Sequence, residues 1–286
     1  MPLINLNAAR VCVPGLDHPE GVARGPEGKL YAGGEAGQVY RLDWEAGAAE
    51  AYANTGGGLN LGLAFDAAGN AYVCNPGDKA VKRVTPDGAV SVYSRGTAER
   101  GMITPNYPAF DAAGNLFIAD SGEWKADNGC TYVLRPGGAA EVIDSECCQF
   151  PNGCAVSPDG EWLYLALSLN HPRVARFPIR AGRKAGPAEI VADLPHTVPD
   201  GLAFTAEGGL LIACYRPDTI FYLRPDGALT VLLDDYEGTL LGAPTNVCFG
   251  GPDLGVLFWA NLGRWHIGCH AATGLRGAPL NYPKLG

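Results

Sequence analysis

The stretch Val198-Pro-Asp-Gly-Leu-Ala-Phe-Thr-Ala-Glu-Gly-Gly-Leu-Leu-Ile-Ala213 holds two short apolar runs separated by a turn. The first run is Gly201 to Phe204 and the second is Leu210 to Ala213. Glycines between the runs suit a tight turn, because glycine adopts backbone conformations that other residues avoid. This stretch therefore predicts a β-hairpin, and the same pattern returns along the whole chain.

Six copies of the hairpin pattern can be aligned, and consecutive copies start 41 to 48 residues apart. The aligned blocks begin at Gly21, Gly62, Tyr107, Gly153, Gly201 and Asn246. In most copies a third and a fourth short apolar run follow, and four short strands at this period are typical of a β-propeller blade. We therefore predict an all-β, six-bladed β-propeller with four antiparallel strands per blade, formed as a single domain by residues 1–286. The last copy is too short for a fourth strand, so we expect Ile4 to Val13 to close the ring.

Composition agrees with a turn-rich globular protein. Of 286 residues, 47% are hydrophobic, 18% are charged, 40 are glycine and 22 are proline. The net charge of −9 argues against nucleic acid or an anionic membrane as a partner. No apolar run is long enough to span a membrane, and the first residues lack the basic and apolar segments of a signal peptide. Nine cysteines without paired spacing indicate a reducing, cytoplasmic compartment.

The residue directly before each aligned block occupies one equivalent position in all six blades. These residues are Glu20, Leu61, Asn106, Asn152, Asp200 and Thr245, and a proline precedes five of them. If the blocks are the innermost strands, these positions surround one mouth of the central channel. Two carboxylates and two amides that converge there suit a hard divalent cation, whereas unneutralised carboxylates would repel each other. The alternative is that these side chains only bind water or cap strand ends.

Further polar residues are expected near the same mouth, because the second strand of each hairpin runs back towards it. Asn75, Asp120 and Asn261 end second strands, where they either support the site or stabilise turns. The loop after Asp120 would bring Glu123 and Trp124 over the mouth.

The motifs Pro19-Glu-Gly21, Pro105-Asn106, Phe150-Pro-Asn-Gly153 and Val198-Pro-Asp-Gly-Leu-Ala203 resemble those of the senescence marker protein/gluconolactonase/luciferin-regenerating enzyme family of six-bladed propellers. The resemblance covers essentially the whole chain. It implies that Glu20, Asn152 and Asp200 hold one divalent metal ion, with Ca²⁺ favoured and Zn²⁺, Mn²⁺ or Fe²⁺ as alternatives. It also implies a small-molecule lactone substrate, contacted by Asn106 and by Glu123. We expect Tyr107, which follows Asn106, to contact the substrate as well.

Two departures from the family pattern concern substrate recognition. Sugar lactonases of the family often carry an arginine where this chain has Thr104, and an Asp-Gly pair where it has Tyr107-Pro108. These changes predict a substrate site that is less polar than that of a typical aldonolactonase.

The function expected from these residues is metal-dependent opening of a small lactone to its hydroxy acid. The metal would polarise the lactone carbonyl and activate a water nucleophile, and Asp200 would accept the water proton as a general base. The alternatives are ester or organophosphate hydrolysis, lactone isomerisation, or a catalytically silent metal-binding propeller. No nucleophile elbow, zinc-protease motif or phosphate-binding loop offers a competing chemistry. The substrate, the metal and the oligomeric state are left open by the sequence.

Overall fold

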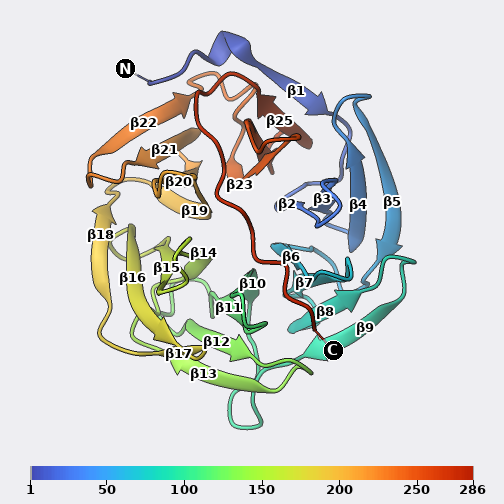
Figure 1. The fold of residues 1–286 in the computed structure, drawn as a ribbon, viewed down its shortest axis with the longest axis vertical. Helices are drawn as coiled ribbons and strands as arrows, with labels where there is room; N and C mark the ends of the chain where they lie inside the picture. Colours follow the sequence, from blue (N-terminus) through green and yellow to red (C-terminus); the bar gives the residue numbers. More distant parts are fainter. Residues whose placement is uncertain (1, 286) are drawn as a thin grey trace.

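The computed structural model describes residues 2–285 and forms a closed ring of six β-sheets. Figure 1 shows the sheets arranged as blades around a common centre. The innermost strand of each blade contacts the innermost strand of the next blade along the chain, and the last of them contacts the first. The predicted six-bladed propeller is confirmed. Among the described residues, no helix is long and apolar enough to cross a membrane.

Each blade is an antiparallel sheet in which consecutive strands lie progressively farther from the channel. Blade 1 comprises β2 (Val22–Arg24), β3 (Leu30–Gly33), β4 (Gln38–Asp43) and β5 (Ala48–Asn54). Blade 2 comprises β6 (Leu63–Phe65), β7 (Ala71–Asn75), β8 (Ala80–Val84) and β9 (Val90–Ser94). Blade 3 comprises β10 (Pro105–Phe110), β11 (Leu116–Asp120), β12 (Cys130–Leu134) and β13 (Ala140–Asp144).

Blade 4 departs slightly from the four-stranded pattern. Its strands are β14 (Pro151–Val156), β15 (Trp162–Leu167), β16 (Arg173–Arg180), the two-residue β17 (Arg183–Lys184) and β18 (Glu189–Asp193). The long strand β16 pairs with β18 along its first half and with β17 near its end. Blade 5 comprises β19 (Val198–Phe204), β20 (Leu210–Arg216), β21 (Thr219–Leu223) and β22 (Leu229–Asp234).

Blade 6 is completed by the beginning of the chain, as predicted. Its strands are β23 (Pro244–Gly250), β24 (Val256–Asn261), β25 (His266–His270) and the outermost β1 (Ala9–Val13). The closing strand is shorter than the expected Ile4–Val13, because a 3₁₀ turn, η1 (Leu6–Ala8), precedes it.

The repeated turn between the first two strands has a local cause. In blade 2, Asp66 Oδ1 accepts hydrogen bonds from the backbone N–H groups of Ala68 and Asn70, at 2.9 and 3.0 Å. Gly69 adopts a φ of +81°, which favours glycine. Asp111 and Gly114 repeat the arrangement in blade 3. The Asp-Ala-Ala-Gly sequence is thus an Asx-type turn that fixes the hairpin register.

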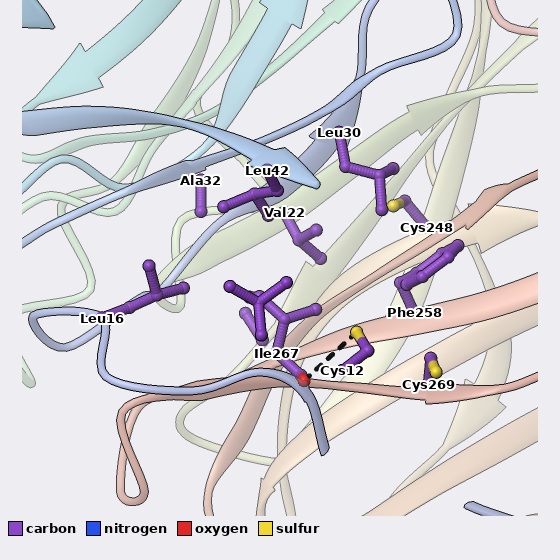
Figure 2. Close-up of a cluster of buried hydrophobic side chains, with 12 residues drawn as sticks. Cys12, Leu16, Val22, Leu30, Ala32, Leu42, Cys248, Phe258, Ile267 and Cys269 are labelled. Carbon is purple, nitrogen blue, oxygen red and sulfur yellow. Dashed lines mark hydrogen bonds between the residues drawn. The ribbon is translucent and has the colours of Figure 1, made fainter. Parts of the chain in front are cut away.

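The hydrophobic core is divided among the interfaces between neighbouring blades. Six buried clusters occur, and each combines residues from two adjacent blades. Figure 2 shows the cluster at the seam between blades 6 and 1, where Cys12 of β1 packs near Phe258, Ile267 and Cys269. Because every blade buries one face against each neighbour, the ring fixes the angular position of all six inner strands.

Candidate metal centre

The six equivalent positions predicted from the repeats are all buried at one end of the inner strands. Glu20 and Asp200 are 6% and 5% exposed, and Asn106, Asn152, Thr245 and Leu61 are similarly buried. The Asp200 carboxyl group lies beside the charge of Glu20 and the amide of Asn152. The structure therefore brings Glu20, Asn152 and Asp200 together from blades 1, 4 and 5.

Close approach of neighbouring inner strands explains why glycine follows most of these positions. A Cβ atom on Gly153 would overlap with the carbonyl oxygen of Asp200 in the next blade. A Cβ atom on Gly201 would lie 2.6 Å from Asn246 Nδ2 and 2.8 Å from the carbonyl oxygen of Thr245. These glycines let the strand ends converge tightly enough for the polar side chains to meet.

Two serines hold the amide groups of Asn106 and Asn152 in one orientation. Asn106 Nδ2 donates to Ser121 Oγ at 3.0 Å, and Ser121 Oγ donates to the carbonyl oxygen of Pro151 at 2.9 Å. Blade 4 repeats this chain, since Asn152 Nδ2 donates to Ser168 Oγ at 3.3 Å and Ser168 Oγ donates to the Pro199 carbonyl at 2.6 Å. Each amide nitrogen is thus tied, through a serine of its own blade, to the backbone of the next blade.

The amide oxygens of these two asparagines are left without a partner. Among the described residues, Asn106 Oδ1 and Asn152 Oδ1 are buried and accept no hydrogen bond. An unsatisfied buried carbonyl oxygen is costly in free energy unless another group or an ion compensates for it. Together with two carboxylates, these oxygens form the kind of donor set that divalent cations such as Ca²⁺ prefer. The residues therefore fit a divalent cation.

The pKa values of both carboxyl groups are shifted upwards. Burial raises the pKa of Glu20 above its usual range. Burial also raises the pKa of Asp200 strongly, and the nearby Glu20 charge adds to this effect while Asn152 opposes it. Two buried acidic groups at this spacing favour protonation, unless a cation neutralises them.

Ser121 and Ser168 were not anticipated from the sequence. Each serine directly follows the last residue of a second strand, at Asp120 and Leu167. The equivalent residues in the other four blades are Glu35, Pro76, Tyr215 and Leu262. Serine therefore occurs at this position only in the two blades whose site residue is asparagine, and this coincidence was the available signal.

The residues at the ends of second strands stabilise loops. Asp120 accepts hydrogen bonds from the backbone N–H groups of Ile103, Thr104 and Gly122, at 2.8 to 3.0 Å. Asn75 and Asn261 likewise bond to neighbouring loop backbone. Of the two interpretations left open by the sequence, turn stabilisation describes all three, and Asp120 also positions the segment before Asn106.

The remaining predicted substrate contacts differ in their placement. Tyr107 lies inside the channel, and its hydroxyl donates to Asn246 Oδ1 at 3.4 Å. Glu123 is exposed, and its carboxylate accepts from Asn128 Nδ2 within the same loop, at 3.3 Å. The neighbouring Trp124 packs edge-to-face on Phe150, with ring centroids 5.0 Å apart. The loop therefore reaches the segment before Asn152, while Glu123 itself faces its own loop.

A second group of possible ligands lies close to Glu20 in the chain. Ligand atoms of Asp17, His18 and Glu35 lie within 4.8 Å of one another. His18 Nδ1 lies 3.1 Å from Asp17 Oδ1, and Asp17 Oδ2 accepts from Gln38 Nε2 at 2.9 Å. This group is partly exposed, and its side chains contact one another at the surface, whereas the asparagine oxygens are buried.

These features define a propeller of six blades with a buried, oxygen-rich, cation-type site at one end of its channel. Residues 35–261 match the model of the SMP-30/gluconolactonase/LRE-like region, and residues 6–42 also match a strictosidine synthase-like N-terminal model. The chain belongs to the SMP-30/gluconolactonase/LRE-like family.

Two curated relatives are similar to parts of the chain. A 6-deoxy-6-sulfogluconolactonase of Pseudomonas putida is 32% identical over 110 residues, which is 37% of this chain and 36% of that protein. A gluconolactonase of Zymomonas mobilis is 27% identical over 219 residues, which is 61% of this chain and 58% of that protein. The matched regions thus span less than two thirds of either relative.

Solved structures share the fold over nearly the full length. A gluconolactonase of Xanthomonas campestris superposes with a TM-score of 0.78 at 20% identity, covering 94% of this chain and 89% of that chain. A calcium-binding regucalcin of Agrobacterium tumefaciens gives a TM-score of 0.78 at 18% identity, with 97% of both chains covered. At these identities the likeness concerns the fold.

Proposed function

We propose that this chain is a metal-dependent lactonase that opens a small lactone, such as a sugar-acid lactone, to its hydroxy acid. The observation that carries this proposal is the buried, unpartnered amide oxygen of Asn152 beside the buried carboxyl groups of Asp200 and Glu20. The names of the partly matching relatives, which include two gluconolactonases, support the choice of lactones as substrates.

Glu20, Asn152 and Asp200 would hold one divalent cation. Oxygen ligands favour Ca²⁺, and Mn²⁺, Zn²⁺ and Fe²⁺ are the other ions to test. When bound, such an ion supplies Lewis-acid stabilisation of negative charge that develops on a carbonyl oxygen and lowers the pKa of water.

The chain's own residues supply positioning and proton transfer. We assign the general-base role to Asp200, because its carboxyl group lies beside Glu20 and Asn152 among the proposed ligands. Thr245 Oγ1 donates to the backbone carbonyl of Glu20 at 2.7 Å and so fixes the strand that presents the Glu20 carboxylate. Asn106 and Tyr107 would contact the lactone, and Glu123 is proposed to do so only after its loop turns towards the channel.

The test is lactone hydrolysis followed by acid release, with metal-stripped protein and single divalent ions added back. We expect metal-dependent turnover that Asp200→Asn lowers by about 10³-fold or more, because a general base typically contributes 10²–10⁴-fold and a metal ligand is altered as well. Glu207→Gln is the matched control, since Glu207 is an exposed acidic residue of the same blade.

Other outcomes separate the alternatives. Acid release from aryl esters or organophosphates but from no lactone would replace the lactonase proposal with another hydrolase at the same site. Tight metal binding without turnover of any substrate would show a catalytically silent propeller. Equal turnover by the wild type and Asp200→Asn would refute the role of Asp200.

A further inference from the structure

A hydrogen bond crosses the central channel from one side of the ring to the other. Tyr107 follows Asn106 on β10 of blade 3, and Asn246 follows Thr245 on β23 of blade 6. The inner strands contact in ring order, so β10 and β23 lie three blades apart in either direction. The Tyr107 hydroxyl nevertheless donates to Asn246 Oδ1 at 3.4 Å. These two side chains, called the crossbar below, therefore span the diameter of the channel.

On one side of the crossbar lies the oxygen-rich site. The Glu20 carboxylate is near enough to contribute to the raised pKa of Tyr107, although burial is the larger cause. Glycine stands at the equivalent position in the other four blades, at Gly21, Gly62, Gly153 and Gly201. The phenol and the amide are thus the side chains that enter the channel at this level.

On the other side lies a cavity of about 140 Å³ that Tyr107 lines and that Glu20, Asn106, Asn152 and Asp200 do not. Its wall carries a ring of small side chains, one from each blade, formed by Ala23, Ala64, Ala109, Ala155, Ala203 and Cys248. Its far end is covered by the C-terminal segment Ala278 to Tyr282, which Figure 1 shows crossing the centre of the ring. This alanine-lined cavity, which Arg24, Ser157 and Asn281 also line, continues the channel beyond the proposed active site.

Packing holds the Tyr107 phenol in place, in addition to the hydrogen bond. A Cβ atom on Gly62 would lie 2.6 Å from Tyr107 Cδ2, so the ring lies against the Gly62 backbone. Cys154 Sγ donates to the backbone carbonyl of Tyr107 at 3.2 Å. Tyr107 is therefore held in a fixed position by contacts from blades 2, 4 and 6.

We propose that the crossbar of Tyr107 and Asn246 is the floor of the active site and restricts it to compact lactones, by separating it from the alanine-lined cavity. The specificity part of this inference rests on the proposed lactonase function. A lactone with an apolar substituent directed along the channel would meet the phenol ring. Without the ring, the same substituent would enter the cavity, where burial of its methylene groups favours binding.

The barrier can be tested without any enzymatic assay, because two thiols lie in the cavity wall. Cys154 and Cys248 line the cavity, and burial raises the pKa of each thiol to about 12. Wild-type protein should therefore react slowly with methyl methanethiosulfonate at these two residues. We expect Tyr107→Ala to increase their rate of modification about tenfold or more, by opening the cavity from the mouth. Peptide mass spectrometry would measure each cysteine, with the partly exposed Cys148 as an internal reference.

A matched control opens the same cavity from the opposite face. Tyr282 lines the cavity within the C-terminal segment, and its hydroxyl donates to the Arg24 carbonyl at 2.7 Å. Tyr282→Ala should also speed modification of Cys154 and Cys248, but it should leave the preference among lactones unchanged. If Tyr107→Ala fails to fold, Asn246→Ala removes the crossing hydrogen bond with less loss of packing and should give a smaller increase in modification.

The specificity test compares kcat/KM for an unsubstituted six-membered lactone and for the same ring with an alkyl chain. Tyr107→Ala should shift the ratio towards the alkyl lactone by about tenfold or more, mainly through KM, because a pocket change of one or two methylenes has an effect of this size. Tyr107→Phe keeps the ring and should retain the wild-type preference.

Each outcome decides a separate question. Unchanged thiol modification in both Tyr107→Ala and Asn246→Ala would refute the proposal that the crossbar blocks access to the cavity, whatever the turnover of the protein. Faster modification with an unchanged lactone ratio would overturn the role in specificity. Loss of turnover in Tyr107→Phe equal to that in Tyr107→Ala would show that the hydroxyl acts on substrate and would also overturn it. Faster modification in a protein that hydrolyses no lactone would refute the proposed function and the specificity role, and would leave only the barrier.

Discussion

Gly153 on β14 shows how a missing side chain lets a proposed metal ligand, Asp200 on β19 of the next blade, lie close to it. Its backbone φ lies in the ordinary range, so conformational freedom does not explain the glycine. The reason is the Asp200 carbonyl, which occupies the place of a Cβ atom. We expect Gly153→Ala to lower the free energy of unfolding by about 2 to 3 kcal/mol, as overpacking does, and to weaken cation binding by displacing Asp200.

The matched control is Gly101→Ala. Gly101 is exposed, its φ is ordinary, and a Cβ atom there would have its nearest neighbour at 3.7 Å. Its substitution should change stability by less than about 0.5 kcal/mol. Urea titration and calcium calorimetry would measure both effects, and equal behaviour of the two variants would contradict the close-approach explanation.

The raised pKa of Glu20 predicts how the metal-free protein responds to pH. In the unfolded chain a glutamate ionises near pH 4, whereas burial shifts this ionisation upwards in the folded protein. Between these two values the folded state binds more protons than the unfolded state, so the free energy of unfolding falls as pH rises. In chelator, wild type should therefore lose stability relative to Glu20→Gln as pH increases from 4 to 8.

Thermal melts of both proteins at each pH would measure this difference. Added Ca²⁺ should restore the wild type at pH 8 and should have little effect on Glu20→Gln. A difference between the two melting temperatures that stays constant or grows in favour of the wild type with rising pH would contradict the linkage.

Some site residues could be predicted from the sequence because the repeat encodes their position. Glu20, Asn152 and Asp200 share one register, and register alone places them on one ring. The roles of Ser121 and Tyr107 could not be derived in this way, because each depends on contact with another blade. Ser121 donates to Pro151 of the next blade, and Tyr107 reaches Asn246 across the channel. Such contacts depend on side-chain direction and inter-blade distance, which a repeat pattern does not contain.

Strand β1 is a whole element that the repeat pattern predicted, although its length depends on local contacts. The short last copy predicted that the N-terminal segment closes the ring, and β1 does pair with β25. The pattern overestimated its length, because Leu6 to Ala8 form a 3₁₀ turn, in which the Asn5 side chain accepts from the Asn7 N–H. The short β17 was also missed, since its pairing depends on the extra length of β16.

We expect β1 to close the ring mainly through its buried side chains. Val13 is fully buried at the seam, while Val11, two residues earlier, is 36% exposed. We expect Val13→Ala to destabilise the protein by about 2 kcal/mol and Val11→Ala by less than about 0.5 kcal/mol, because only the former leaves a cavity between blades 6 and 1. Chemical denaturation would measure both variants, and equal losses would show that β1 closes the ring through backbone pairing alone.

The C-terminal segment links the blades of the whole molecule on the face opposite the proposed cation site. Gly277 and Ala278 donate backbone hydrogen bonds to Leu254 and Phe204 in blades 6 and 5, each at 2.9 Å. Asn281 Nδ2 donates to the Phe110 carbonyl in blade 3 at 2.9 Å, and Tyr282 reaches blade 1. One segment therefore ties together blades that are not neighbours, which no contact between adjacent blades can do.

Removal of residues 276–286 should consequently weaken the whole ring while sparing the cation site. Loss of these hydrogen bonds and of the buried contacts would cost about 5 kcal/mol, equivalent to a fall in melting temperature of roughly 10 °C or more. The increase in melting temperature caused by Ca²⁺ should persist, because Glu20, Asn152 and Asp200 sit at the opposite ends of the inner strands. Scanning calorimetry with and without Ca²⁺ would measure both quantities. An unchanged melting temperature would show that the blades need no cross-ring tie, and loss of the Ca²⁺ effect would show that the two ends of the channel are coupled.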